Sequence, residues 1–524
     1  MTALMDRRLR LTRGIDRARQ IRGDATALSY GTLNLTWHQF GDRVARLASV
    51  LRSLGTGEGD RTSILAHSSH RYVEALHAAL WAGGVAAPVN SRFSRAEIAE
   101  MLRDCAPKVL IIDDAFLADA EAVLPELPER PVLLHAGEEP APAGWLSYEA
   151  VLAATPPIED AGRGGDDLAC LFYTGGTTGQ AKGVMLSHAN LCTNALNISG
   201  PVGLGEHAIH LHCGPLFHLA AAGRVFAVTV FGGQHVVLPR FDPAEVLRAI
   251  ARHRVTLATF VPTMINSLLA EPDLEAHDLS SLRTISYGAA PMPETLQRRL
   301  MEVLPRCGLL QSYGMTETSP VVTMLTREMH DPALGKLNSA GRAIANVDLR
   351  IADPDDRPVP RGVVGEIQVR GPTVMLGYWH RPDLTEAALR GGWMHTGDGG
   401  YLDEDGYLVV VDRLKDMIVS GGENVYSAEV ENAIHRHPAV AECAVFGIPD
   451  PVWGEAVHAV VVAKDGEELT SAAVIAHCRS LIAGYKCPKA VEIQAELLPR
   501  SGVGKILKSA LRAPWWADRA RRIN

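Results

Sequence analysis

The sequence predicts an α/β protein with a large N-terminal domain of covered sheets and a small C-terminal α+β domain. Short apolar runs that begin at Ser63, Val85 and Val109 alternate with helical segments such as residues 72–81. That alternation is typical of βαβ units, in which helices cover a parallel sheet. After Asp412 the pattern changes to shorter, mixed elements, so we place the domain boundary between residues 412 and 413.

The clearest single element is a helix that begins after Thr36. Thr36 and Gln39 form a T-x-x-Q capping box, in which each side chain bonds the backbone N–H of the other residue. Gly55 supplies the stop signal. Between these ends, apolar side chains recur at helical spacing, at Phe40, Val44, Leu47, Leu51 and Leu54. The pattern predicts an amphipathic helix with one buried face.

The chain after Asp412 predicts a separate small α+β unit. The run M-I-V at Met417 is typical of a strand, and a helix is expected from Ser427. Two further apolar runs, at Ala444 and Val457, predict strands, and they precede a second helix that bears Val474, Cys478, Leu481 and Ile482. We therefore expect residues 1–412 and 413–524 to fold as two domains.

The composition excludes several classes of protein. The 524 residues are 47% hydrophobic and 21% charged, as in ordinary globular proteins, and no apolar run is long enough to cross a bilayer. The first residues are basic but lack an apolar core after them, so a secretory signal is not expected. A formal charge of -9 argues against nucleic acid as the main partner, although local anion sites remain open.

Eight cysteines are scattered along the chain and never form C-x-x-C. This spacing predicts neither a zinc site nor a disulfide framework. A reducing compartment fits such a chain, and we expect a cytoplasmic protein.

A glycine- and threonine-rich loop runs from Tyr173 to Val184, Y-T-G-G-T-T-G-Q-A-K-G-V. Glycines let backbone N–H groups approach an anion, threonines add hydroxyl donors, and Lys182 adds a positive charge, so the loop suits a polyphosphate. The Walker pattern fails, because Lys182 is followed by Gly183 where that pattern has Ser or Thr. The preceding run C-L-F-Y predicts a buried strand, and Ser187 caps a following helix. For the loop alone, a flexible surface turn stays open.

This loop resembles the phosphate loop of the adenylate-forming superfamily, which includes acyl-CoA synthetases, luciferases and the adenylation domains of peptide synthetases. Gly175 and Ala181 depart from the commonest form, in which Ser and Pro are frequent. Seven further segments resemble family motifs in the same order: P-L-F-H ending at His218, S-Y-G-A-A-P from Ser286, Q-S-Y-G-M-T-E-T from Gln311, G-E-I-Q-V-R-G-P from Gly365, H-T-G-D ending at Asp398, D-R-L-K-D from Asp412 through Y at Tyr426, and L-P-R-S-G-V-G-K ending at Lys505. Chance agreement at so many ordered sites is negligible.

The resemblance implies a site for ATP and Mg²⁺. Its nucleotide-binding residues would be Thr174, Gly175, Gly176, Thr177, Gly179, Lys182, Gly288, Ala289, Ala290, Gln311, Ser312, Tyr313, Gly314, Thr316, Asp398 and Arg413. Glu317 and Thr178 would hold the metal, for which a carboxylate is a suitable hard oxygen ligand. From the residues alone, Glu317 fits a solvated surface acid better than a metal ligand, and Asp398, after an apparent turn, could form an Asx-turn with its glycine neighbours.

The resemblance also implies a two-step reaction in which a carboxylate and ATP give acyl-AMP and pyrophosphate, and a thiol then displaces AMP. The catalytic residues would be Lys505, Glu317, Thr178 and His218, with Lys505 stabilising the charge of the first step. The C-terminal domain would be mobile about Lys415, and Gly421 and Gly422 would line the thiol channel. Taken alone, His218 fits a buried histidine and Lys505 a solvated lysine.

The expected thiol is coenzyme A, because the sequence after Lys505 leaves no room for a carrier-protein domain. The segments expected to line the acyl pocket are mostly small or apolar, and only Arg224 among them could pair with a second carboxylate. We therefore expect an uncharged medium- or long-chain fatty acid, or an aryl acid such as a cinnamate. A dicarboxylate, a carrier-protein ligase, a luciferase-type enzyme and a noncatalytic ATP-binding relative are the alternatives. A homodimer is left open.

Overall fold

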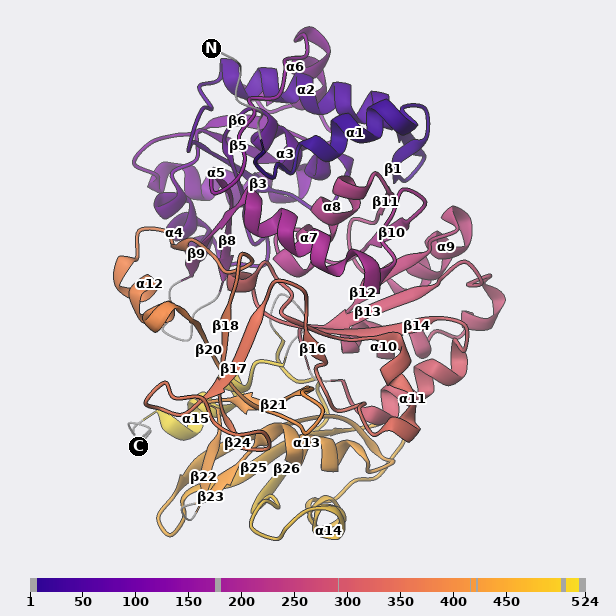
Figure 1. Ribbon diagram of the computed structural model, residues 1–524, viewed down its shortest axis with the longest axis vertical. Coiled ribbons are helices and arrows are strands. Elements are labelled where there is room, and N and C mark those ends of the chain that lie inside the picture. Colours follow the sequence, from indigo (N-terminus) through magenta and orange to yellow (C-terminus); the bar gives the residue numbers. More distant parts are fainter. Residues whose placement is uncertain are drawn as a thin grey trace.

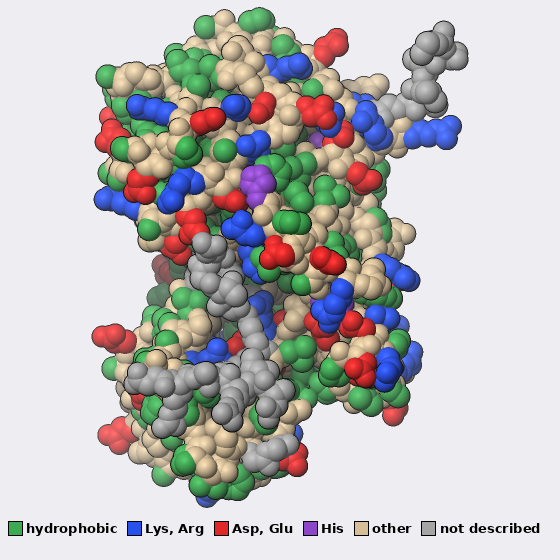
Figure 2. All heavy atoms as spheres, turned by 90° about the vertical axis from the view of Figure 1, so that its left-hand side faces the viewer, with side chains coloured by type: hydrophobic (Ala, Val, Ile, Leu, Met, Phe, Trp, Pro, Cys, Tyr) green, Lys and Arg blue, Asp and Glu red, His purple; other side chains and the backbone are tan. Residues whose placement is uncertain are grey.

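The computed structural model describes residues 7–174, 181–290, 292–414, 416–420, 423–500 and 506–517. A large body holds the N-terminal part of the chain, and a smaller one holds the C-terminal part (Figure 1). On the face drawn in Figure 2, basic and acidic side chains are intermixed, and the surface is hollowed between the two bodies. The predicted mixed α/β fold with a smaller C-terminal domain is confirmed.

An eight-stranded sheet contains the βαβ units that the sequence predicts. Its order is β19-β9-β8-β4-β3-β5-β6-β7. The strands from β8 to β7 in this order are parallel, whereas β9 and β19 run antiparallel to their neighbours. The bounds are β3 Arg61–Leu65, β4 Val85–Pro88, β5 Val109–Ile112, β6 Val132–His135, β7 Leu146–Ser147, β8 Leu168–Thr174, β9 Lys182–Ser187 and β19 Gly377–Tyr378.

A nine-stranded sheet has the order β16-β15-β14-β13-β12-β10-β11-β1-β2. Its central strands, β14 to β1 in this order, are parallel, and antiparallel strands close both edges. The bounds are β1 Thr26–Tyr30, β2 Leu33–Thr36, β10 Ile209–His212, β11 Gln234–Val237, β12 Leu257–Phe260, β13 Thr284–Gly288, β14 Gly308–Tyr313, β15 Thr323–Leu325 and β16 Arg342–Ala343.

Helices cover these sheets. One group, drawn in the upper half of Figure 1, consists of α1 Arg13–Arg22, α2 Trp37–Ser53, α3 His70–Trp81, α7 His188–Val202 and α8 Leu219–Phe231. Their apolar side chains share one core with both sheets. Two further helices, α6 Tyr148–Ala154 and α12 Pro382–Ala388, pack against the same core. Two smaller cores lie under the remaining helices, which are α4 Arg95–Cys105, α5 Leu117–Val123, α9 Pro243–His253, α10 Pro262–Leu269 and α11 Glu294–Val303.

A four-stranded antiparallel sheet, β17-β18-β20-β21, leads from the large body to the small one (Figure 1). Its strands are β17 Asp348–Ala352, β18 Gly365–Arg370, β20 Met394–Leu402 and β21 Leu408–Arg413. The small body is a five-stranded sheet of β22 Ile418–Ser420, β23 Glu423–Val425, β24 Val440–Asp450, β25 Gly454–Ala463 and β26 Ala490–Gln494, packed with α13 Ser427–His435, α14 Ser471–Leu481 and α15 Lys508–Trp516.

Two predicted helix caps are confirmed. Thr36 and Gln39 form both hydrogen bonds of the capping box, and the helix runs to Ser53. Ser187 caps α7 with a second capping box. All eight cysteines are free. Within the described residues, none of the helices combines the length and apolarity that a membrane crossing requires.

Candidate active site

The predicted nucleotide residues collect where parallel strands of the nine-stranded sheet end. Gly288 ends β13 and lies beside Ser312 near the end of β14, so both motifs reach the same edge. Ligands of open α/β sheets bind outside these carboxyl ends. A Cβ on Gly288 would lie 2.2 Å from the carbonyl oxygen of Ser312, so only glycine lets the two strands approach here. This brings Gly288, Ala289, Ala290, Gln311, Ser312, Tyr313 and Gly314 together.

Tyr313 also contacts the predicted ribose-binding pair. Its hydroxyl donates to Oδ2 of Asp398 at 2.8 Å, and Nε of Arg413 lies 3.4 Å from Oδ1 of the same carboxylate. Burial, followed by the charge of Asp398, raises the pKa of Tyr313 well above its ordinary value. The phenol is therefore a hydrogen-bond donor that holds the carboxylate in place. The structure brings three predicted residues from three motifs into one cluster.

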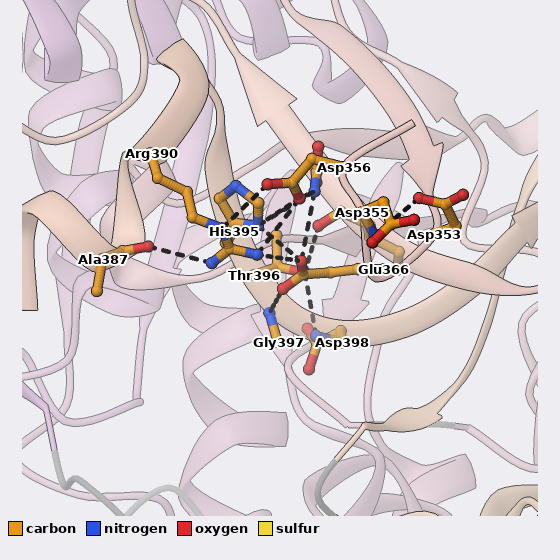
Figure 3. Close-up of polar contacts among 12 residues, drawn as sticks. Asp353, Asp355, Asp356, Glu366, Ala387, Arg390, His395, Thr396, Gly397 and Asp398 are labelled. Atoms are coloured by element: carbon orange, nitrogen blue, oxygen red, sulfur yellow. Dashed lines mark hydrogen bonds and ion pairs between the residues drawn. The ribbon is translucent and has the colours of Figure 1, made fainter. Parts of the chain in front are cut away.

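Asp398 lies inside strand β20, rather than just beyond a turn as the sequence indicated. The strand is irregular at Gly397, whose φ of +70° lies in the left-handed region that glycine adopts freely. The backbone N–H of Gly397 donates to Oε1 of Glu366 at 3.1 Å, and that of Asp398 donates to the hydroxyl of Thr396 at 3.1 Å. Glu366 and Thr396 thus hold the bend that aims Asp398 (Figure 3).

Behind this bend lies a cluster of Asp356, Glu366 and His395, whose ligand atoms lie within 4.8 Å of one another (Figure 3). Nδ1 of His395 lies 2.7 Å from Oε2 of Glu366. Arg390 donates to Asp356 at 3.1 Å, and the amide of Gln368 donates to the same carboxylate at 2.8 Å. Because the carboxylates already have these donors, we interpret the cluster as a support for the bend and not as a cation site.

A second functional cluster surrounds Glu317. This residue lies in the short 3₁₀ helix Thr316–Thr318, its carboxylate is buried, and the hydroxyl of Tyr378 donates to Oε1 at 2.8 Å. Burial raises the pKa of Glu317, although its own backbone N–H and Tyr378 oppose the shift. The alternative of a solvated surface acid is therefore excluded.

Lys182 reaches the same cluster from the neighbouring sheet. Its Nζ lies 5.1 Å from the centre of the Tyr378 ring, a cation–π contact, and β9 pairs Lys182 with Thr174 of β8. The glycine loop therefore connects two antiparallel strands, and the helix that Ser187 caps begins one strand later.

Sequence reasoning missed Tyr378. The only signal was the aromatic pair after a glycine in G-Y-W, which indicates no particular chemistry by itself. Tyr378 becomes part of the site because β19 pairs with β9, which places its ring between Lys182 and Glu317.

His218 occupies the N-terminal end of α8 and is partly buried beside Phe217, with ring centres 4.5 Å apart. It follows β10, one of the strands that end at the site edge. The remaining predicted site residues lie outside the described part of the chain; they are Gly175, Gly176, Thr177, Thr178, Gly179, Lys415, Gly421, Gly422 and Lys505.

Comparison with known proteins identifies the family. Residues 15–379 match the family described as AMP-binding enzyme, and residues 429–505 match the AMP-binding enzyme C-terminal domain. The chain belongs to the family of AMP-binding enzymes. It is an AMP-forming acyl-CoA synthetase of the adenylate-forming superfamily, as its motifs predict.

Individual relatives are similar over almost their whole length. A feruloyl-CoA synthase from Amycolatopsis sp is 44% identical over 490 residues, 93% of this chain and 95% of the relative. An indoleacetate–CoA ligase from Aromatoleum aromaticum is 38% identical and covers 96% of this chain and 98% of its own. Among solved structures, ATP-bound MatB from Rhodopseudomonas palustris has a TM-score of 0.87 at 31% identity, covering 97% of this chain and 99% of that one.

Proposed function

We propose that this enzyme joins an aryl carboxylic acid to coenzyme A through an acyl-AMP intermediate. The observation that carries the chemistry is the approach of two clusters to one sheet edge: Tyr313 with Asp398 and Arg413, and Glu317 with Tyr378 and Lys182. The first offers a carboxylate for ribose hydroxyls beside an aromatic ring. The second offers a buried acid and a cation for phosphates. Forming the acyl-AMP before the thioester makes the displacement by the thiol easier, because AMP is a far better leaving group than oxide.

Each described residue has a role that its surroundings support. Asp398 would accept the ribose hydroxyls, with Tyr313 and Arg413 fixing its orientation. Lys182 would pair with a phosphate, and Tyr378 holds its ammonium group in place through the ring face. His218, at the start of α8, would orient the substrate carboxylate where the acyl pocket meets the phosphates.

The residues around Glu317 fit a magnesium ion. The Tyr378 hydroxyl bonds only Oε1, and carboxylate oxygens are the ligands that Mg²⁺ prefers. When bound, Mg²⁺ would neutralise charge on the phosphates of ATP. Thr178 is the second predicted ligand.

The C-terminal domain, residues 413–524, would supply Lys505 for adenylation and then rotate for thioester formation. Rotation needs a residue that absorbs a change in φ and ψ, for which we propose Lys415. Gly421 and Gly422 would then line the channel for the thiol. The described residues nearby support a junction here, since Asp412 accepts from the backbone N–H of Ser427 at 2.8 Å while Arg413 contacts Asp398.

The aryl class is favoured because the feruloyl- and indoleacetate-activating relatives have higher identity than the fatty-acid ligases. A medium- or long-chain fatty acid is the second candidate, supported by a 36% identical medium/long-chain-fatty-acid–CoA ligase from Mycobacterium tuberculosis. We also propose that the enzyme is cytoplasmic and that it forms a homodimer. Light scattering would measure the mass of the particle in solution and so test the homodimer.

The test is pyrophosphate release from ATP and Mg²⁺ with acetate, octanoate, palmitate, benzoate, ferulate or malonate, each with and without coenzyme A. We expect an aryl acid to turn over fastest, with AMP as product and stimulation by coenzyme A. Fastest turnover with palmitate or octanoate would favour the second candidate. Absence of turnover with every acid, despite binding of ATP, would contradict the aryl-acid proposal.

A further inference from the structure

Asp104, near the C-terminal end of α4, contacts two segments that are far apart in the sequence. Its Oδ2 accepts a hydrogen bond from the hydroxyl of Tyr173 at 2.7 Å, and its Oδ1 lies 3.6 Å from Nδ1 of His380. Its backbone carbonyl accepts from Nε1 of Trp379 at 3.1 Å. Tyr173 lies near the end of β8, and the other two residues directly follow β19. Asp104 therefore links the two strands that flank β9 in the sheet.

The hydrogen bond between Tyr173 and Asp104 lies mostly away from water. Tyr173 is 4% exposed, and the side chain of Asp104 is 20% exposed. Burial, followed by the neighbouring groups of Cys105 and Asp104, raises the pKa of Tyr173 far above its ordinary value. The phenol therefore keeps its proton and donates. A hydrogen bond to an ionised acceptor is stronger than one between neutral groups.

The end of α4 that carries Asp104 is itself held in place. The last carbonyl groups of a helix have no partner within that helix. Here Arg61 of β3 supplies donors: its Nε bonds the carbonyl of Cys105 at 2.6 Å, and its Nη2 bonds that of Ala106 at 2.9 Å. The guanidinium of Arg61 also lies over the ring of Trp379, 5.3 Å from its centre. Arg61 thus ties the helix end to the same tryptophan that bonds Asp104.

The two linked segments meet at Gly183 of β9. In the sheet Gly183 pairs with Tyr173, and its carbonyl accepts from the backbone N–H of Trp379 at 2.7 Å. A Cβ on Gly183 would lie 3.0 Å from Cζ of Tyr173 and 3.1 Å from Cβ of Trp379, closer than ordinary van der Waals contact. Both side chains therefore pack on the side of Gly183 where another residue would carry its own side chain.

Two residues of the proposed phosphate site adjoin these contacts directly. Lys182 precedes Gly183, and Tyr378 precedes Trp379. The hydroxyl of Tyr378 donates to Glu317, and its ring lies beside the ammonium group of Lys182. A shift of the backbone at Trp379 would therefore displace both the ring and the hydroxyl of Tyr378.

Building on the proposed function, we propose that Asp104 is a positioning residue for the phosphate end of the ATP site. It acts through Tyr173 and Trp379, which fix the strands on either side of Lys182, and not on ATP itself. Lys182 and Tyr378 then meet the phosphates and their metal ion in one geometry. Loss of a residue that orients the groups around a metal site typically costs about 10- to 100-fold in affinity or activity.

The test measures binding of α,β-methylene-ATP with Mg²⁺ by calorimetry, which requires neither an acid nor turnover. Asp104→Leu removes the acceptor at similar volume, whereas Asp104→Asn keeps an oxygen that accepts from Tyr173. The control is Asp119→Leu, since Asp119 of α5 pairs with Arg95 at the other end of α4. We expect Asp104→Leu to weaken binding about 10-fold, Asp104→Asn to lose less, and the control to bind as the wild type does.

Steady-state kinetics and a double-variant cycle separate positioning from general loss of stability. Asp104→Leu should raise the KM for ATP and leave kcat at saturating ATP largely unchanged, whereas partial unfolding would lower kcat without raising KM. Because Asp104 acts on Tyr378 through Trp379, adding Tyr378→Phe to Asp104→Leu should weaken binding by less than the product of the two single losses. Losses that simply multiply would contradict this route.

Wild-type affinity for the analogue in Asp104→Leu would overturn the proposal, as would a fall in kcat with an unchanged KM. If Asp104→Leu does not fold, Tyr173→Phe, which removes the same hydrogen bond, decides by the same criterion. Absence of analogue binding by the wild type would overturn the proposed function as well. Tight binding that Asp104→Leu leaves unaffected would overturn the positioning role alone.

Discussion

The hydroxyl of Tyr313 donates a 2.8 Å hydrogen bond to the carboxylate of Asp398, although 85 residues separate them in the chain. Tyr313 ends a strand of the nine-stranded sheet, and Asp398 lies in the four-stranded sheet that leads to the C-terminal domain. The bond therefore joins two sheets at the proposed nucleotide site. The orientation of Asp398, the proposed ribose-binding acid, thus depends on how the two sheets pack.

Tyr313→Phe should raise the KM for ATP about 10-fold, because a hydrogen bond to a charged group contributes about 1.5–3 kcal/mol. Arg413 still contacts Asp398, so the loss should be partial. The measurement is pyrophosphate release at varied ATP. Tyr401→Phe, in the same strand as Asp398, is the control and should leave KM unchanged. An unchanged KM in Tyr313→Phe would show that this bond does not position the nucleotide.

Glu317→Gln should abolish magnesium-dependent adenylation and at the same time raise the melting temperature of the ligand-free protein. Burial raises the pKa of Glu317 above 4.5. The folded state therefore disfavours the carboxylate, and this destabilisation is absent below the ordinary pKa and present above the raised one. Glutamine removes the charge while still accepting from Tyr378.

Two measurements check this expectation: melting temperature against pH, and pyrophosphate release against Mg²⁺. The wild type should lose stability relative to Glu317→Gln as pH rises through the window above 4.5. The activity of the wild type should instead fall as the pH is lowered, because acid protonates Glu317, the proposed metal ligand. Glu328→Gln, at an exposed site, is the control. Full activity of Glu317→Gln would contradict the metal assignment.

Lys505→Ala should block formation of acyl-AMP but leave conversion of supplied acyl-AMP to the thioester. An amine that stabilises charge in the first step is not needed in the second. The two half-reactions would be measured separately, by pyrophosphate release and by coenzyme A consumption. Lys489→Ala, a surface lysine over the ring of Trp453, is the control. Adenylation at the wild-type rate, or equal loss of both steps, would contradict the assignment.

Lys508→Met should destabilise the C-terminal domain by about 3 kcal/mol, because it leaves Glu431, a largely buried acid, without its cation. Nζ of Lys508 lies 2.8 Å from Oε1 of Glu431. Burial alone would lower the pKa of Lys508, but Glu431 and Asp412 raise it. Denaturant unfolding measures the effect. The double variant Lys508→Met/Glu431→Gln should recover much of the stability. If the losses in free energy of unfolding of the two single variants simply add in the double variant, the two residues are not coupled.

Local sequence signals predicted much of the fold. The capping boxes at Thr36 and Ser187 depend on residues three positions apart, so the sequence displays both partners. The parallel pairing of β3, β4 and β5 follows from the alternation of apolar runs with helices. The hairpin of β8 and β9 was missed, because the loop pattern alone does not distinguish strand from helix beyond it.

For the site, the sequence by itself determined which residue types the chemistry requires and the order of their motifs. Only the tertiary structure decided which of them touch. Tyr378 joins Lys182 and Glu317 because β19 pairs with β9, and Tyr313 bonds Asp398 because the nine-stranded and four-stranded sheets meet there. Hydrogen bonds between segments far apart in the chain, and the burial of side chains between them, depend on how the sheets and helices pack. The spacing of residues along the sequence does not reveal that packing.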